Sequence, residues 1–333
     1  MKLASLIATE FDEAWYRADL ASIVGDRSDD EIAAWIDSLC RRHLGREVID
    51  ARFASKSVGA VFGLALADGE AVVLKLFPQT ISEAELRAMG RCLAHAIASG
   101  YPAPKQLVPL FHAERGWAAF YELVPGIVRD AHDAGVRRQL AHGLADFARV
   151  MTGIDPSGLP LSAARGATLW PPPHRVVIDL TIAGGEWIDA RAEAAQRVLR
   201  AAELPVVVAH FDWRVDNVLF DGERLAAVLD WDSLAAASEA EMVGRSAATF
   251  TAHWPGFGSI TPTRDEASAF VHEYEAARGR RFDAVEQRVI NASADYLLAH
   301  VGRQGHSAPG CADDDFRALL RATADAPLVA FTR

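Results

Sequence analysis

The sequence predicts an α+β protein of two lobes, the first rich in antiparallel sheet and the second rich in helix. Short β-type runs gather in residues 48–123, helical patterns dominate after residue 126, and Val124-Pro125-Gly126 breaks the chain between them. Helices and strands do not alternate along the chain, so an alternating parallel α/β sheet is not expected. We therefore expect an N-terminal lobe at residues 1–124 and a larger C-terminal lobe at residues 125–333.

Capping and turn signals predict the elements of the N-terminal lobe. Ser28 and Glu31 form a capping box before one helix, Ser82 and Glu85 form another, and Asp68-Gly69 marks a hairpin. The strands should form a sheet of about five. The expected elements are a helix from Ser28 to Gly45, strands at Val58–Leu66 and Ala71–Phe77, a helix at Ser82–Ser99, and strands at Leu107–Phe111 and Trp117–Leu123.

The C-terminal lobe reads as helices interrupted by one small region of strands. That region runs from Pro205 to Trp231 and contains the turn signal Asp221-Gly222. A rigid, proline-rich loop is expected at Leu169–Pro173. The expected helices are Ala131–Thr152, Ile188–Ala202, Glu239–Thr251, Asp265–Arg278 and Asp283–Val301.

The composition excludes several classes of protein. The chain has 333 residues, 50% of them hydrophobic and 24% charged, which is typical of a globular protein with room for two domains. Its net charge of −11 argues against a nucleic-acid partner. No apolar run approaches the ~20 residues of a membrane span, and the N-terminal apolar run is too short for a signal peptide. Three widely spaced cysteines fit neither a zinc site nor a secreted disulfide framework, so we expect a cytoplasmic protein without a membrane partner.

Three polar side chains stand at strand edges in the small β region. If Phe220 pairs with Leu225 across the hairpin, Asn217 lies opposite Val228 and Asp230 becomes its diagonal neighbour. Asp212 lies in the loop just before this hairpin. Carboxylate and amide oxygens are ligands that suit Mg²⁺. The spacing therefore predicts that Asn217 and Asp230 converge on one metal ion, with Asp212 close by.

This pattern resembles a known catalytic loop. His-x-Asp-x-x-x-x-Asn at residues 210–217, followed by Asp230 on the next strand, is similar to the catalytic loop and metal-binding Asp of the protein-kinase-like superfamily. With Leu229-Asp230-Trp231 and the weaker motifs at 72–76, 100–104 and 121–126, the chain resembles the aminoglycoside phosphotransferase family, which includes choline-kinase-like enzymes. The resemblance covers residues 50–260 and implies a bilobal protein-kinase-like fold with a small catalytic hairpin.

The resemblance also implies roles for individual residues. The chain has only four lysines among its 34 basic residues, and Lys75 lies in an apolar strand, which independently favours a special role for it. The helix glutamate that pairs with Lys75 is either Glu85 or Glu83. The implied roles are Asp212 as the catalytic base, Asn217 and Asp230 as Mg²⁺ ligands, Lys75 on the phosphates, Gly59 in the loop 55–63 that covers them, and backbone groups of Glu122 and Val124 on the base of ATP or GTP.

Some positions depart from the family pattern and leave alternatives open. Arg214 stands two residues after Asp212, where it either contacts the γ-phosphate or forms a surface salt bridge. The expected Gly-Asp-Pro after the metal-binding Asp is replaced by Ala237-Ser238-Glu239. Glu239 and Glu241 either attract a cationic acceptor or belong to a solvated face.

These observations together predict a kinase that moves the γ-phosphate of a nucleotide to a hydroxyl of a small molecule. The expected partners are the nucleotide, Mg²⁺ and the hydroxyl acceptor. The acceptor is an aminoglycoside-like or other cationic molecule, or a metabolite such as choline, a sugar or an amino alcohol. A different class also fits, namely a nucleotide-binding regulator that keeps the fold without turnover.

Overall fold

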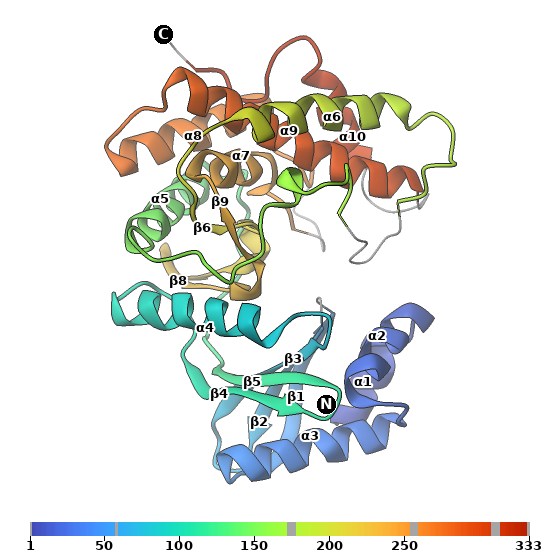
Figure 1. Cartoon of the computed structure of the whole chain (residues 1–333). Coiled ribbons are helices and arrows are strands. Elements are labelled where there is room, and N and C mark those ends of the chain that lie inside the picture. The colour runs from blue at the N-terminus through green and yellow to red at the C-terminus, as the bar shows by residue number, and fades with distance from the viewer. Residues whose placement is uncertain (1, 57–58, 172–177, 254–258, 308–313, 332–333) are drawn as a thin grey trace. The chain divides into compact units, whose positions relative to one another are not determined.

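A computed structural model describes residues 2–56, 59–171, 178–253, 259–307 and 314–331 (Figure 1). The chain divides into two compact units. The N-terminal unit comprises residues 1–97 and 104–124, and the C-terminal unit comprises residues 98–103 and 125–333. No helix in the described part of the chain is long and apolar enough to cross a membrane.

The N-terminal unit is built on a five-stranded antiparallel sheet with the order β1-β2-β3-β5-β4. Its central strand β3 alternates, so that Val72, Leu74 and Leu76 are buried in the core shared with α1 and α3, while Lys75 lies on the opposite face. The elements are α1 (Leu3–Glu10), α2 (Ala14–Val24), α3 (Asp29–Leu44), β1 (Val48–Lys56), β2 (Ala60–Leu66), β3 (Ala71–Pro78), α4 (Glu83–Ala98), β4 (Gln106–Ala113) and β5 (Gly116–Glu122).

Local signals set the ends of these elements as expected. Both bonds of the Ser28–Glu31 capping box are present, and Gly45 ends α3 in the left-handed region at φ 72°. Gly69 adopts φ 88° in the β2–β3 turn. The prediction of antiparallel sheet is therefore confirmed. The start of the first predicted strand was placed too early, because β2 begins at Ala60, and residues 57–58 lie outside the described part.

The C-terminal unit is mainly helical, with α6 and α7 packed on α9 and α5 packed on α8 (Figure 1). Two short antiparallel strand pairs, β6 with β9 and β7 with β8, carry the loops of interest. The elements are α5 (Ala134–Val150), α6 (Glu186–Ala201), β6 (Val207–His210), β7 (Val218–Asp221), β8 (Arg224–Val228), β9 (Leu234–Ala237), α7 (Glu239–Thr249), α8 (Arg264–Arg278), α9 (Ala284–Ser307) and α10 (Asp314–Ala322).

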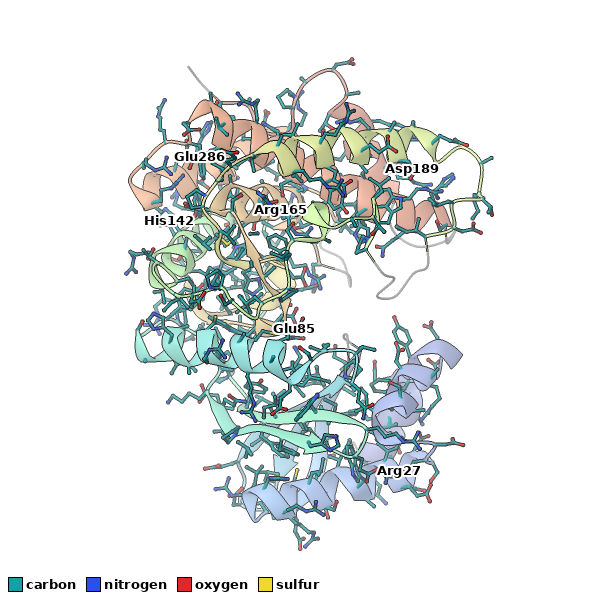
Figure 2. All side chains as sticks on the ribbon, in the orientation of Figure 1. Arg27, Glu85, His142, Arg165, Asp189 and Glu286 are labelled. Atoms are coloured by element: carbon teal, nitrogen blue, oxygen red, sulfur yellow. The ribbon has the colours of Figure 1, made fainter. Side chains whose placement is uncertain are left out.

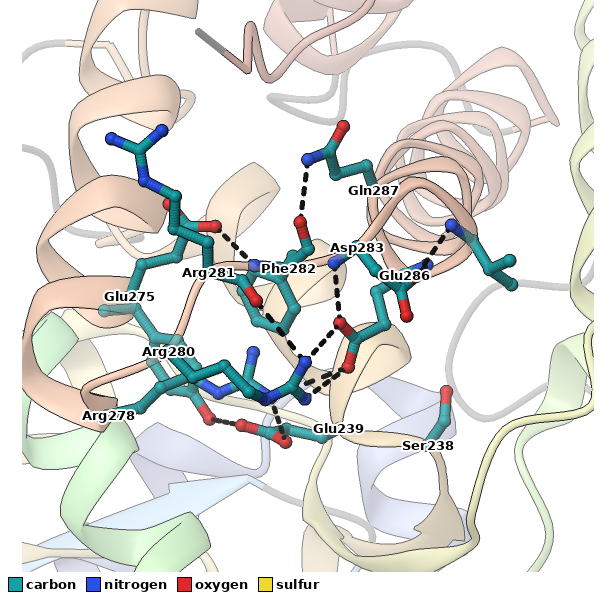
Figure 3. Close-up of polar contacts among 12 residues, drawn as sticks. Ser238, Glu239, Glu275, Arg278, Arg280, Arg281, Phe282, Asp283, Glu286 and Gln287 are labelled. Atoms are coloured by element: carbon teal, nitrogen blue, oxygen red, sulfur yellow. Dashed lines mark hydrogen bonds and ion pairs between the residues drawn. The ribbon is translucent and has the colours of Figure 1, made fainter. Parts of the chain in front are cut away.

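A cluster of ion pairs holds the start of α7 to the junction of α8 and α9 (Figure 3). Arg278 pairs with Glu239 at 2.9 Å and stacks over the Phe282 ring, with its guanidinium carbon 4.0 Å from the ring centroid. Arg280 pairs with Glu286 at 2.6 Å. Glu239 also accepts a hydrogen bond from Tyr274. Glu239 is thus a structural residue of this unit.

Candidate active site

His210 braces the loop that connects β6 to β7. Its imidazole is fully buried, with Nε2 at 3.0 Å from the carbonyl oxygen of Leu229 and Nδ1 at 3.4 Å from the Ser233 hydroxyl. The ring also packs edge-on against Trp213. Because both ring nitrogens face partners inside the unit, His210 holds the loop in place.

Asp212 and Asn217 are joined directly within that loop. The Asn217 side-chain amide donates to the backbone oxygen of Asp212 and to its Oδ2, both at 2.8 Å. Asn217 also accepts a hydrogen bond from the Leu229 amide on its backbone oxygen, at 2.8 Å. Since its side-chain nitrogen is engaged with Asp212, the amide oxygen of Asn217 is directed away from that carboxylate.

The predicted register of the hairpin was wrong by one residue. Phe220 pairs with Leu225 as expected, but Leu219 pairs with Ala227 and Val218, not Asn217, pairs with Val228. Ala226 is the extra residue in β8, a bulge that the sequence pattern does not reveal. The shift sets Asn217 beside Leu229, the residue before Asp230, so the two expected ligands still come from adjoining strand ends.

Asp230 adopts an unusual backbone conformation. Its φ of 58° and ψ of 46° lie in the left-handed region, which is rare for residues other than glycine. Its carbonyl oxygen accepts hydrogen bonds from the amide and hydroxyl of Ser233, at 3.0 and 2.7 Å. The short turn that follows fixes this conformation and with it the direction of the carboxylate.

Arg214 lies among three carboxylates. It donates from Nε to Asp212 at 3.1 Å and from Nη1 to Asp216 at 3.2 Å, and Asp216 also contacts the ring of His253. Burial acts to lower the pKa of Arg214, but the charges of Asp212, Asp216 and Asp230 outweigh burial and raise it. Arg214 thus forms the ion pairs that one alternative foresaw, but with only 22% of its side chain exposed they are partly buried. Asp216 and His253, whose pairing no sequence signal indicates, complete this network.

The donor set suits a magnesium ion. In the described part of the chain, no three His, Cys, Asp or Glu side chains come together as a metal site. Mg²⁺ is usually held by one or two protein oxygens and completed by water and substrate phosphates. One carboxylate from Asp230 and one amide oxygen from Asn217 fit that requirement.

Lys75 and its candidate partners lie in the N-terminal unit. Lys75 is half-buried in β3, opposite Ala119 of β5. Glu83 is exposed and pairs with Arg87 at 2.6 Å, whereas Glu85 is half-buried (Figure 2). Burial raises the pKa of Glu85, although a hydrogen bond from the Ser82 amide opposes the rise. These contacts favour Glu85 over Glu83 as the partner of Lys75.

The remaining expected nucleotide contacts are constrained by the same sheet. The amide of Glu122 donates to Lys105 at 2.9 Å, and its carboxylate accepts from the Lys105 amide at 2.9 Å, so neither group is left for a nucleotide base. The Glu122 carbonyl and Val124 remain as candidates. A Cβ at Gly59 would collide with the carbonyl of Leu76, so only glycine allows that loop to lie on β3 beside Lys75.

The structure does not support the expectation that Glu239 and Glu241 attract a cationic acceptor. Glu239 is held by Arg278 and Tyr274. Glu241 is almost fully buried, pairs with Arg165 at 3.0 Å, and caps α7 by accepting from the Ser238 amide. Both carboxylates are neutralised within the C-terminal unit.

One unit is an antiparallel sheet with helices, and the helical unit carries Asp212 and Asn217 in one loop and Asp230 just after the neighbouring hairpin. This is the arrangement of a phosphotransferase of protein-kinase-like fold. The chain belongs to the phosphotransferase enzyme family (APH), whose model matches residues 54–282. The resemblance inferred from the motifs is confirmed, and so is the function class of small-molecule phosphotransfer. No curated protein matches the chain.

Solved structures show the same fold at low identity. An amicoumacin kinase in complex with AMP-PNP and Ca²⁺ matches with a TM-score of 0.64 and 9% identity over 91% of this chain and 98% of its own. An ethanolamine kinase from Plasmodium vivax has a TM-score of 0.57 and 11% identity, over 90% of both chains. The macrolide 2'-phosphotransferase MphH from Brachybacterium faecium has a TM-score of 0.53 and 18% identity, over 90% of this chain and 99% of its own.

Proposed function

We propose that this enzyme transfers the γ-phosphate of ATP or GTP to a hydroxyl of a small molecule, with Asp212 as the catalytic base. The observation that carries the proposal is the bonding of Asp212. Asn217 and Arg214 both donate to its carboxylate and hold it in place, and 36% of its side chain remains exposed. An acceptor hydroxyl can therefore reach a fixed carboxylate oxygen that can take its proton.

Asn217 and Asp230 would hold Mg²⁺, which supplies charge neutralisation and orientation of the phosphates. Asn217 then has two tasks, since its amide nitrogen fixes Asp212 and its amide oxygen faces the ion. Arg214 would contact the transferred phosphate while it keeps the neighbouring carboxylates from repelling one another. The low exposure of Arg214 and its carboxylate partners support this role.

In the N-terminal unit, Lys75 with Glu85 would bind the phosphates. The backbone around Gly59 would add amide donors to the phosphates. The Glu122 carbonyl and Val124 would bind the nucleotide base. Support comes from the half-buried setting of Glu85 and from the nucleotide analogue in the amicoumacin kinase complex.

The test is nucleotide consumption with Mg²⁺ across amino sugars, macrolides, choline, simple sugars and hydroxy acids, read against the acceptor-free rate. Asp212→Asn should lower acceptor-dependent turnover by about 100- to 10,000-fold and leave nucleotide binding intact, because the base acts on the acceptor. Asp221→Asn, on the exposed hairpin turn, is the matched control and should keep full activity. Nucleotide binding without acceptor-dependent turnover would favour the regulator instead.

A further inference from the structure

Arg245 is a second arginine beside the catalytic loop, and the proposed reaction gives it no task. It extends from α7 to Phe211, the residue before Asp212. Its Nε donates to the Phe211 carbonyl at 3.2 Å, and its guanidinium carbon lies 4.7 Å from the centroid of the Phe211 ring. These contacts fix the orientation of the guanidinium group and leave both of its Nη groups for another partner.

No acidic side chain in the described part of the chain forms an ion pair with Arg245. Burial lowers its pKa, although the charges of Asp212, Tyr296 and Glu241 oppose the change. Two of these groups are engaged elsewhere, because Asp212 pairs with Arg214 and Glu241 pairs with Arg165. A half-buried cation without a counter-ion is costly, so the site lacks a negative charge that a ligand can supply.

The surroundings of Arg245 add positive charge. Arg200 of α6 donates to the Gly166 carbonyl and forms no ion pair with a described residue. Its charge and that of Arg245 both act on Tyr296 of α9. Arg165, labelled in Figure 2, has a buried Nη2 atom without a hydrogen-bond partner in the structure. Arg200 is exposed to solvent, so after the ion pairs are counted Arg245 is the half-buried arginine of this group that has no carboxylate partner.

The chemistry of the open donors indicates what ligand fits. With Nε occupied, Nη1 and Nη2 present parallel N–H groups that match the two oxygens of a carboxylate. Because Arg245 forms no ion pair with a described residue, a carboxylate suits its open donors better than an amine does.

We infer that the acceptor carries a carboxylate, which Arg245 binds so that a hydroxyl of the same molecule reaches Asp212. The statement that the bound carboxylate is the phosphate acceptor rests on the proposed phosphotransfer. Binding of a carboxylate at Arg245 does not require turnover. It replaces the cationic acceptor with a hydroxy acid as the substrate class.

The test compares matched ligands by their effect on thermal unfolding, with and without ADP and Mg²⁺, at equal ionic strength. The probes are gluconate, sorbitol and N-methylglucamine, together with glycerate, glycerol and serinol, which differ in charge on similar chains. We expect the carboxylates to raise the melting temperature more than their neutral and amine counterparts. Arg245→Gln, which keeps a donor for the Phe211 carbonyl, should weaken carboxylate binding by roughly 10- to 100-fold.

Arg224→Gln serves as the control because that side chain is 84% exposed on the β7–β8 hairpin. It should keep the preference for carboxylates. Equal stabilisation by amines or neutral alcohols, no stabilisation by either carboxylate, or an unchanged preference in Arg245→Gln would each overturn the inference. A purely structural Arg245 would lower stability without changing the order of the ligands.

The two proposals fail in different ways. If only amine acceptors are phosphorylated, the proposed phosphotransfer holds and the inference of a carboxylate on the acceptor is wrong. A carboxylate preference that depends on Arg245, without consumption of nucleotide for any acceptor, would support the anion site and contradict the phosphotransfer.

Discussion

At the scale of single residues, the charged side chains of the catalytic loop are held in place by their partners. Asp212 is held by one amide and one guanidinium, and Arg214 spreads its charge over several carboxylates. This arrangement orients the Asp212 carboxylate before any substrate arrives, so that its position relative to an acceptor hydroxyl is set in advance.

The two expected metal ligands should contribute differently to Mg²⁺-dependent nucleotide affinity. Asp230→Ala should remove most of the Mg²⁺-dependent part of nucleotide affinity, because a full negative charge is lost. Asn217→Ala should weaken that affinity less, since an amide oxygen carries only a partial charge. Calorimetric titration of ADP with and without Mg²⁺ measures both. Equal Mg²⁺ dependence in Asp230→Ala and the unaltered enzyme would contradict the assignment.

Residue-level reasoning from the sequence proposed part of this site. The spacing within 210–230 predicts roles for Asp212, Asn217 and Asp230, and the structure places Asn217 against Asp212. Arg245 left no signal, because it is one arginine among many and reaches Phe211 only through the packing of α7 on the β6 loop. A lone charge that a distant helix brings to a site cannot be recognised before the packing is known.

At the scale of elements, capping motifs predicted helix ends well. Ser28 and Glu31 set the start of α3, and Ser82 bonds to the amide of Glu85 in the first turn of α4. Helices α1 and α2 were not predicted, because they are short and apolar over most of their length, so neither shows a clear helical alternation of apolar and polar residues. The bulge at Ala226 was also missed, since an extra residue changes the register without changing composition.

A pH-dependent contact joins the segment before α5 to the start of α8. The ring nitrogens of His132 lie 2.9 Å from the Glu266 carboxylate and 2.9 Å from the Ser259 carbonyl, so only the doubly protonated ring donates to both. Burial acts to lower the pKa of His132, but these two acceptors outweigh it and raise the pKa above 6.5. Burial acts to raise the pKa of Glu266, and hydrogen bonds from Thr263 and His132 outweigh it and lower the pKa below 4.5.

The directions of these two pKa shifts define the pH range in which the His132–Glu266 contact stabilises the fold. The His132 contribution is complete below its unfolded pKa and disappears as pH rises through its raised folded pKa. The Glu266 contribution is complete above its unfolded pKa and disappears as pH falls through its lowered one. His132→Gln should therefore cost about 1 kcal/mol near pH 5.5 and little at pH 9, as measured by urea unfolding. A cost that does not change across this range would contradict the pairing.

At the scale of the whole molecule, the α+β fold with a sheet-rich and a helix-rich part followed from the grouping of patterns along the chain. The β-type runs that predict the five-stranded sheet all precede Val124, and that sheet is present. The structure assigns residues 98–103 to the C-terminal unit, although they lie between elements of the N-terminal one. Sequence order alone does not reveal such a crossing, because assignment to a unit depends on contacts.

Buried thiols offer a probe of opening in the N-terminal unit. Burial raises the pKa of Cys40 to about 12 and also raises the pKa of Cys92, so neither forms thiolate readily while the unit is folded. In a Cys311→Ser background, an aromatic disulfide reagent should label neither thiol rapidly in the native state and both in urea. Labelling should slow further with nucleotide bound. Rapid native labelling at either position would show that the packing described for α3 or α4 is wrong.

The left-handed backbone of Asp230 has a consequence for the stability of this enzyme. A residue with a Cβ pays roughly 1 kcal/mol for that conformation, whereas glycine adopts it freely. Asp230→Gly should therefore be more stable to urea than Asp230→Ala and at least match the unaltered enzyme, while it loses Mg²⁺-dependent nucleotide binding. Stability alone would favour glycine at this position, so the aspartate in this chain places a carboxylate at the site at a cost to the stability of the fold.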